Sequence, residues 1–214
     1  MPESAQTESA QAESAQAESA LPPGQYTPAS WPVLHYGRVP AFDPESWDFR
    51  VCGATESGRE HCWGWREFRA LPRCRVIADL HCVTKFSIQG IAWEGVPAAA
   101  VLQAAPPAAA ATHVMVWADF GYSANVQIGD FAADETLLAT RCNGAELTPD
   151  HGYPVRLVVP GLYGWKSVKW VRAVEYLTWD RRGFWEERGY HNTADPWREQ
   201  RYSYQERAGE GPPL

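Results

Sequence analysis

The sequence predicts one α+β domain built on a mixed sheet, rich in strands and loops and poor in helices. Its apolar runs are short and are interrupted by 17 glycines and 17 prolines, which is typical of strands joined by loops. The runs do not follow the regular strand–helix alternation of a doubly wound fold. The chain has 214 residues, is 45% apolar and contains eleven tryptophans, so it has enough material for one sizeable core.

Four segments are expected to form strands. Residues 75–83 (RVIADLHCV) and 113–118 (HVMVWA) are rich in the β-branched and apolar side chains that strands favour. Residues 156–159 (RLVV) indicate a buried strand that ends at Pro160, and residues 167–179 (SVKWVRAVEYLTW) indicate a long strand. Strands therefore supply most of the predicted regular structure.

One segment carries the signals of a helix. Residues 97–105 (PAAAVLQAA) place a proline at the first helical position, where no backbone donor is lost, and Pro106 and Pro107 end the segment. A second short helix is expected after Asp134. Helices therefore contribute little to the predicted fold.

The domain organisation follows from composition. Residues 3–20 repeat a five-residue ESAQA unit without large apolar side chains, so they cannot bury enough surface to offset the entropy lost on ordering. We expect residues 1–29 to form a disordered repetitive tail. The folded domain is expected over residues 30–204, followed by a flexible end at residues 205–214.

Composition also excludes several classes of function. The net charge is −7 and no block of Lys or Arg is present, which argues against nucleic-acid binding. No run of about 18 or more apolar residues predicts a membrane span, and the amino terminus lacks an export-signal layout, so a cytoplasmic location is expected. The sequence has no P-loop and no GxGxxG motif. Five cysteines without a C-x-x-C pair argue against a disulfide framework or a zinc knuckle.

Cys82 is the candidate reactive thiol, because it falls at the end of a predicted strand, where side chains enter cavity-lining loops. Its neighbour His81 would point to the opposite face of the strand, so a Cys–His hydrolase pair would need a distant histidine. The alternative is a thiolate that ligates a soft or high-valent metal. The residues alone leave both uses open.

Residues 151–170 have the composition of an anion-binding segment. Glycines at positions 161 and 164 allow the backbone to approach a bound group, and the basic side chains and hydroxyl supply charge-assisted donors. A solvated basic edge of a strand is the structural alternative. The candidate anion ligands are Arg156, Lys166, Ser167 and Lys169.

These two segments together resemble a known family. The pattern H-G-x-P-x-R-L-V-V-P-x-x-x-G-x-K-S-x-K-W of residues 151–170 and the cysteine in DLHCVT are similar to the molybdopterin-binding domain of the sulfite oxidase family. The similarity is greatest to its short, single-domain bacterial branch and covers residues 31–204. It implies a mixed α+β sulfite-oxidase fold, a molybdopterin cofactor without haem, and Cys82 as the molybdenum ligand.

The resemblance also assigns roles to individual residues. Tyr190 corresponds to a tyrosine that approaches the substrate pocket, and Lys85, three residues past the ligand, is a second catalytic candidate that has a solvent-facing loop cation as its alternative. Expected donors to the Cys82 sulfur are backbone N–H groups of residues 83–85. The residues expected to contact the cofactor are His35, Tyr36, Cys82, His151, Arg156, Ser167, Val168 and Lys169.

The implied activity is a cytoplasmic oxidoreductase that transfers an oxygen atom to or from a small oxyanion or an S- or N-oxide. Sulfite is disfavoured as substrate, because Cys82 is followed by VTKF rather than by the arginines that hold a dianion in sulfite-oxidising members. A separate electron-transfer partner is expected. The alternatives are a non-catalytic protein that binds pterin or another phosphorylated ligand, and a Cys–His hydrolase.

Overall fold

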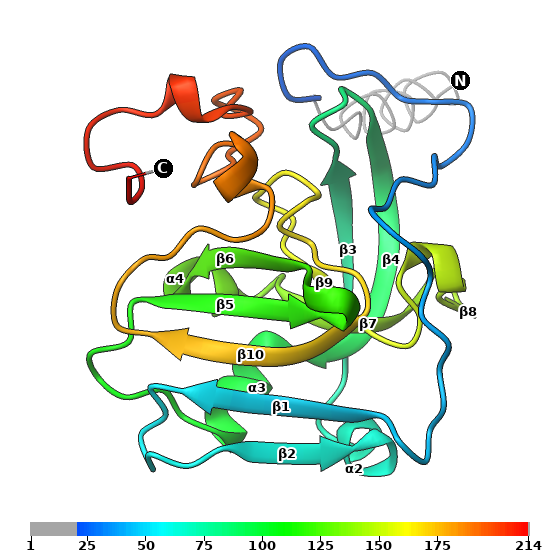
Figure 1. Cartoon of the computed structure of the whole chain (residues 1–214). Coiled ribbons are helices and arrows are strands. Elements are labelled where there is room, and N and C mark those ends of the chain that lie inside the picture. The colour runs from blue at the N-terminus through cyan, green and yellow to red at the C-terminus, as the bar shows by residue number, and fades with distance from the viewer. Residues whose placement is uncertain (1–20, 214) are drawn as a thin grey trace, which may run out of the picture.

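Two sheets form the framework of the protein, and the computed structural model describes residues 21–213 of it (Figure 1). The first sheet has the strand order β2-β1-β10-β5-β6, in which β1 and β10 are parallel and the other neighbours are antiparallel. Its strands are β1 (Asp48–Gly53), β2 (His61–Gly64), β5 (His113–Ala118), β6 (Ser123–Gln127) and β10 (Val171–Leu177).

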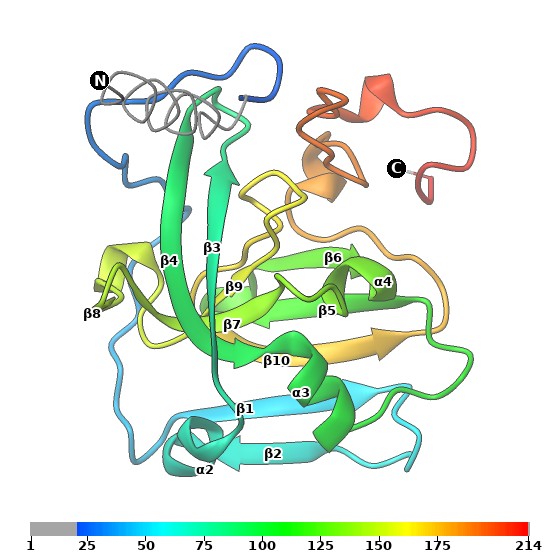
Figure 2. The ribbon, with the colours of Figure 1, turned by 180° about the vertical axis from the view of Figure 1, so that it is seen from behind.

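The second sheet is antiparallel and has the order β3-β4-β7-β8, with β9 paired to β7. Its long β3–β4 hairpin runs across the direction of the first sheet's strands in both views (Figures 1 and 2). Its strands are β3 (Cys74–His81), β4 (Ser87–Pro97), β7 (Leu137–Cys142), β8 (Ala145–Glu146) and β9 (Arg156–Val158).

Helices are short and few, so the predicted α+β class with few helices is confirmed. The α-helices of the described chain are α2 (Trp65–Ala70), α3 (Ala98–Ala104) and α4 (Ile128–Phe131). Its 3-10 helices are η1 (Asp119–Gly121), η2 (Pro149–His151), η3 (Glu186–Arg188) and η4 (Ser203–Gln205).

Two of the predicted elements differ from the structure. The short helix expected after Asp134 is wrong: α4 precedes this position, and the Thr136 N–H and hydroxyl bond to carbonyls of residues 133 and 130, which closes a turn into β7. The long strand expected from residue 167 begins only at Val171. Trp170 has a left-handed φ of 56°, which is incompatible with a continuous strand.

The main core lies between the two sheets. Side chains of β1, β5 and β10 pack there against side chains of β4, β7, β9 and α3. Each fully buried aliphatic or aromatic side chain contributes about 1.5–3 kcal/mol relative to exposure. Examples without measurable exposure are Phe49, Val51, Val96, Val116, Leu138, Leu157 and Val174.

Contacts of the folded domain extend beyond the expected limits at residues 30 and 204. Tyr26 forms a parallel bridge with Phe86, the residue before β4. Near the other end, Glu206 pairs with Arg182 at 2.6 Å. The repetitive segment of the expected tail lies outside the described residues. Within residues 21–213, no helix is both long and apolar enough to cross a membrane.

A buried ion pair fixes the segment that precedes β10. Lys166 Nζ lies 2.6 Å from Glu186 Oε1, and both side chains are almost fully shielded from solvent. Lys166 also donates to the backbone and side-chain oxygens of Asn125, at 2.8 and 2.7 Å. Trp165 Nε1 donates to the same Glu186 oxygen at 2.9 Å. The pair therefore joins β6, the 163–170 turn and η3.

Replacing Lys166 with Met is expected to lower the free energy of unfolding by about 3–5 kcal/mol, because it leaves the Glu186 carboxylate buried without a counter-charge. Urea denaturation measures the change. The double variant Lys166→Met/Glu186→Gln is expected to recover part of the loss. Arg188→Ala, which removes an exposed cation of η3, is the control. A loss for Lys166→Met no larger than that of the control would contradict this role.

Candidate active site

One cavity of about 540 Å³ gathers most of the predicted site residues. Its walls come from five separate parts of the chain, within residues 34–38, 82–84, 119–122, 164–170 and 184–190, and Arg156 of β9 adds to them. The predicted residues that line it are His35, Tyr36, Cys82, Arg156, Ser167, Val168, Lys169 and Tyr190. His151 and Lys85 are not among the lining residues.

Cys82 lies directly after β3, in a turn closed by two backbone hydrogen bonds. Its N–H donates to the Phe86 carbonyl at 2.8 Å, and the Lys85 N–H donates to the Cys82 carbonyl at 3.0 Å. The sulfur is 3.1 Å from the Thr84 hydroxyl. The expected contact of the sulfur with backbone N–H groups is therefore replaced by this hydroxyl contact.

The histidines do not form a catalytic pair with Cys82 in the described chain. His81 is buried on the other side of the strand, where its Nδ1 lies 2.8 Å from the Ser87 hydroxyl. His35, the one histidine among the lining residues, has its Nδ1 3.0 Å from the Gly37 carbonyl. The geometry therefore lacks the thiol–imidazole hydrogen bond of a Cys–His hydrolase.

Arg156 is a buried cation without a counter-charge. Its side chain donates to the carbonyls of His151 and Ser167 at 3.1 and 3.2 Å, and its Nε is buried without a partner. No carboxylate of residues 21–213 forms an ion pair with it. Burial lowers its pKa to about 10. A buried guanidinium that faces a cavity under these conditions is suited to an anionic ligand.

Lys169 supplies a second positive charge on the same wall. Its Nζ donates to the Leu34 and Asp150 carbonyls at 2.9 and 2.6 Å. Burial and the nearby Arg156 guanidinium lower its pKa to about 7. An anion bound beside these two cations would favour the protonated form of Lys169.

Two glycines bring the walls together. Gly152 has a φ of +110°, and a Cβ there would lie only 3.0 Å from the Arg156 Cβ and 3.2 Å from the Lys169 Cβ. Gly164 donates its N–H to the His81 carbonyl at 2.6 Å, and a Cβ on it would lie 3.3 Å from that oxygen. Glycine at these positions permits a close backbone approach that other residues would strain.

Three predicted ligand or site residues lie elsewhere. His151 stacks on Trp31 with ring centroids 4.1 Å apart, behind the cavity wall, and burial lowers its pKa to about 4. Lys166 does not contribute to the anion site, because it is buried against Glu186. Lys85 is exposed, with a left-handed φ of 78°, in the turn after Cys82.

An aromatic wall completes the cavity, and motif analysis did not identify most of it. Tyr190 packs against Trp165 and Trp185, with ring centroids 5.0 and 5.1 Å apart. Tyr122 donates its hydroxyl to the Trp165 carbonyl at 2.8 Å. Burial raises the pKa of both tyrosines, so both phenols stay protonated at neutral pH. In the sequence, the high density of aromatic residues in these loops is the one signal that such a wall exists.

The residues present fit a phosphorylated pterin cofactor that carries a thiolate-bound metal. A cysteine sulfur and an uncompensated arginine face one cavity, and glycines admit a ligand close to the backbone. No group of three or more His, Cys, Asp or Glu side chains within residues 21–213 is arranged to hold a metal by itself. A thiol and an unpaired guanidinium around one cavity are the features expected of the molybdopterin-binding class.

The family comparison agrees with this assignment. Residues 36–185 match the family model described as "Oxidoreductase molybdopterin binding domain". The chain belongs to this family of oxidoreductases. The predicted membership in the sulfite-oxidase-like group is confirmed by the relatives below.

Known relatives place the chain in the sulfite-oxidase-like group. It is 38% identical over 185 residues to the "Uncharacterized oxidoreductase YuiH" of Bacillus subtilis, covering 86% of this chain and 92% of that protein. It is 30% identical to the sulfite oxidase of Gallus gallus, covering 71% of this chain and 39% of that protein.

A solved structure has the same fold. The sulfane dehydrogenase SoxCD of Paracoccus pantotrophus matches with a TM-score of 0.61 and 22% identity, covering 68% of this chain and 41% of the other. The chain thus spans most of its Bacillus relative but less than half of the Gallus sulfite oxidase and of the SoxCD chain.

Sulfate binding to cofactor-free protein is expected to weaken as pH rises above about 7. Lys169 loses its proton around this pH, so affinity for a dianion falls by up to about tenfold per pH unit. Sulfate is chosen because it does not titrate in this range. Calorimetry from about pH 6 to about pH 9 measures the effect, with Lys169→Met as the control. A pH dependence that is unchanged in Lys169→Met would contradict the assignment of the titrating group to Lys169.

Proposed function

We propose that the protein is a molybdenum-dependent oxidoreductase in which Cys82 ligates the metal of molybdopterin. It transfers an oxygen atom to or from a small oxyanion or an S- or N-oxide. The observation that carries the proposal is that the Cys82 sulfur and the uncompensated Arg156 guanidinium face the same cavity. A hydrolase needs no such cation, and a plain basic surface would not bury it.

The cavity residues divide into cofactor contacts and substrate contacts. Arg156 and Lys169 would hold the phosphate end, and the backbone of the 167–169 turn would approach it. His35 and Tyr36 would border the pterin. When bound, the cofactor supplies a metal that changes oxidation state by two electrons while an oxygen atom is gained or lost.

The protein's own contribution is orientation, hydrogen bonding and exclusion of water. The Thr84 hydroxyl lies 3.1 Å from the Cys82 sulfur and, once a bound metal holds that sulfur as thiolate, would donate to it and moderate its charge. The Tyr190 phenol, protonated at neutral pH, lines the cavity as a hydrogen-bond donor for a substrate oxygen. The surrounding indole and phenyl rings limit the entry of water.

Neutral S- and N-oxides fit the cavity better than sulfite does. The turn after Cys82 brings no cation into the cavity, because Lys85 does not line it. Arg156 and Lys169 are assigned here to the cofactor phosphate, and the remaining arginine of the cavity wall, Arg38, lies over the Phe120 ring at 4.4 Å. A dianion next to Cys82 would therefore have no counter-charge from the turn that carries the sulfur.

We further infer a cytoplasmic location in a bacterium, a separate electron-transfer partner and no haem in the protein itself. Support for the location is that all five cysteines are free, as is usual in a reducing compartment. The Bacillus relative supports a bacterial source. A non-catalytic protein that binds the same cofactor is the outcome to be distinguished experimentally.

The test combines metal analysis with the Cys82→Ala variant. The wild-type protein is expected to contain about one molybdenum per chain and to show a visible thiolate-to-metal absorption band, which Cys82→Ala loses. Cys142→Ala, which removes a half-buried thiol outside the cavity, is the matched control and is expected to keep the band. A band that persists in Cys82→Ala would contradict ligation.

Activity separates an enzyme from a binding protein. Dye-coupled assays with sulfoxides and N-oxides are expected to show turnover that falls at least about a hundredfold in Cys82→Ala. Molybdenum-loaded protein without turnover of any sulfoxide, N-oxide, nitrate or sulfite would support the non-catalytic alternative. Faster turnover of sulfite than of the neutral oxides would contradict the substrate assignment.

A further inference from the structure

The turn that presents Cys82 is held mainly from outside itself. Residues 82–86 belong to neither a helix nor a named strand except at the Phe86 bridge, and Lys85 has a left-handed φ of 78°. Two internal hydrogen bonds close the turn. The carbonyls of Cys82, Val83 and Lys85 all accept hydrogen bonds from distant segments.

The first of these segments is the N-terminal strap, defined as residues 22–27. The Gln25 amide Nε2 donates to the Cys82 carbonyl at 3.1 Å, and the Tyr26 N–H donates to the Lys85 carbonyl at 2.9 Å. The Ser87 hydroxyl donates to Gln25 Oε1 at 3.4 Å, which orients the amide. The strap thus fixes the backbone of the residue that carries the sulfur.

The second segment carries Arg201, which is buried with 6% exposure. Its Nη1 donates to the Val83 carbonyl at 2.6 Å, and its guanidinium lies over the Tyr163 ring at 4.9 Å. Its Nη2 lies 3.5 Å from the Pro23 carbonyl of the N-terminal strap. One side chain therefore joins the Cys82 turn, the strap and the 163–170 turn.

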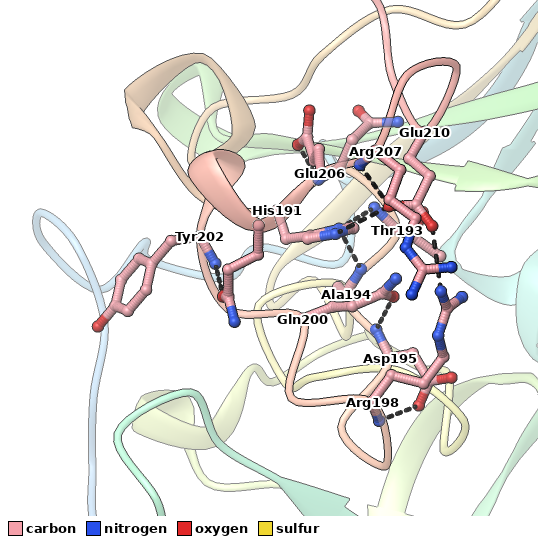
Figure 3. A network of polar contacts seen from close by, with 12 residues as sticks. His191, Thr193, Ala194, Asp195, Arg198, Gln200, Tyr202, Glu206, Arg207 and Glu210 are labelled. Atoms are coloured by element: carbon pink, nitrogen blue, oxygen red, sulfur yellow. Dashed lines mark hydrogen bonds and ion pairs between the residues drawn. The ribbon is translucent and has the colours of Figure 1, made fainter.

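The loop that carries Arg201 is itself fixed by a polar network (Figure 3). The Asp195 N–H donates to the Gln200 side chain at 3.1 Å, and the Thr193 N–H donates to His191 Nδ1 at 3.0 Å. The His191 N–H donates to the Arg201 carbonyl at 3.1 Å. Arg201 thus projects from a loop whose backbone is fixed by hydrogen bonds. A residue can position another only if its own backbone is fixed in this way.

We infer that Gln25 and Arg201 are positioning residues for Cys82, which fix its turn so that the sulfur faces the cavity. They contact backbone carbonyls and not the sulfur, so they act through the turn. Both lie outside residues 36–185, the part of the chain that matches the family model. The inference rests on the proposed function, because it concerns the geometry of the metal-ligating thiolate.

The decisive variant is Gln25→Glu in the full-length holoprotein. Glutamate keeps the size and the acceptor for Ser87 but cannot donate to the Cys82 carbonyl when ionised. We expect a shifted or weakened thiolate-to-metal absorption band and a kcat about tenfold lower, with KM for the oxide substrate changed less than about twofold. Arg201→Met is expected to act in the same direction, and Arg201→Lys to restore part of the band.

Matched controls separate positioning from general stability. Thr27→Ala removes another hydrogen bond of the N-terminal strap, from Thr27 to Gln89, without touching the Cys82 turn. Arg198→Ala removes an ion pair with Glu210 from the loop of Arg201. Both interactions are exposed, so both controls are expected to change the melting temperature little and to leave the absorption band unchanged.

Failure of the positioning inference and failure of the proposed function would give different results. A wild-type protein without molybdenum or without the band overturns the proposed function. A normal wild-type band that is equally intact in Gln25→Glu, Arg201→Met and the controls overturns the positioning inference alone. If circular dichroism shows that Gln25→Glu is unfolded, the uncharged variant Gln25→Met replaces it, with the same expected band change.

Discussion

The hydrogen bond from the Gly164 N–H to the His81 carbonyl determines how the site is assembled. It joins the end of β3, which presents Cys82, to the turn that carries Lys169, at 2.6 Å. The absence of a side chain at Gly164 permits this approach. Two residues further on, Lys166 is buried in an ion pair with Glu186, which fixes the same turn to η3. The spacing between Cys82 and Lys169 is therefore set by this backbone hydrogen bond together with the buried ion pair.

Local sequence patterns were sufficient for the parts of the site that depend on short segments. The strand end at Cys82 and the arginine at the start of β9 follow from hydrophobic runs and their punctuation. The glycines in the 151–170 pattern mark the close approaches that the structure shows at Gly152 and Gly164. The α+β class was predictable because the order of strands and helices is itself a local property.

Features that depend on long-range packing were not predictable in this way. The charge of Lys166 indicated an anion ligand, yet its environment is a buried carboxylate contributed by η3. His151 directly precedes Gly152, but its ring stacks on Trp31 behind the cavity wall. The parallel pairing of Arg50 with Ala173 likewise joins distant parts of the chain without a local signal. The sequence specifies which residue types are present, whereas tertiary packing decides which of them line the cavity.

The parallel pairing of β1 with β10 also has a consequence for biosynthesis. A ribosome releases the chain from its amino terminus, so β1 has no partner on this side until β10, at Val171–Leu177, has been made. The cavity walls at residues 184–190 and the arginine at position 201 emerge later still. A nascent chain therefore has an incomplete cavity until these segments have been made, so a group that needs all of the cavity walls binds after translation has passed residue 201.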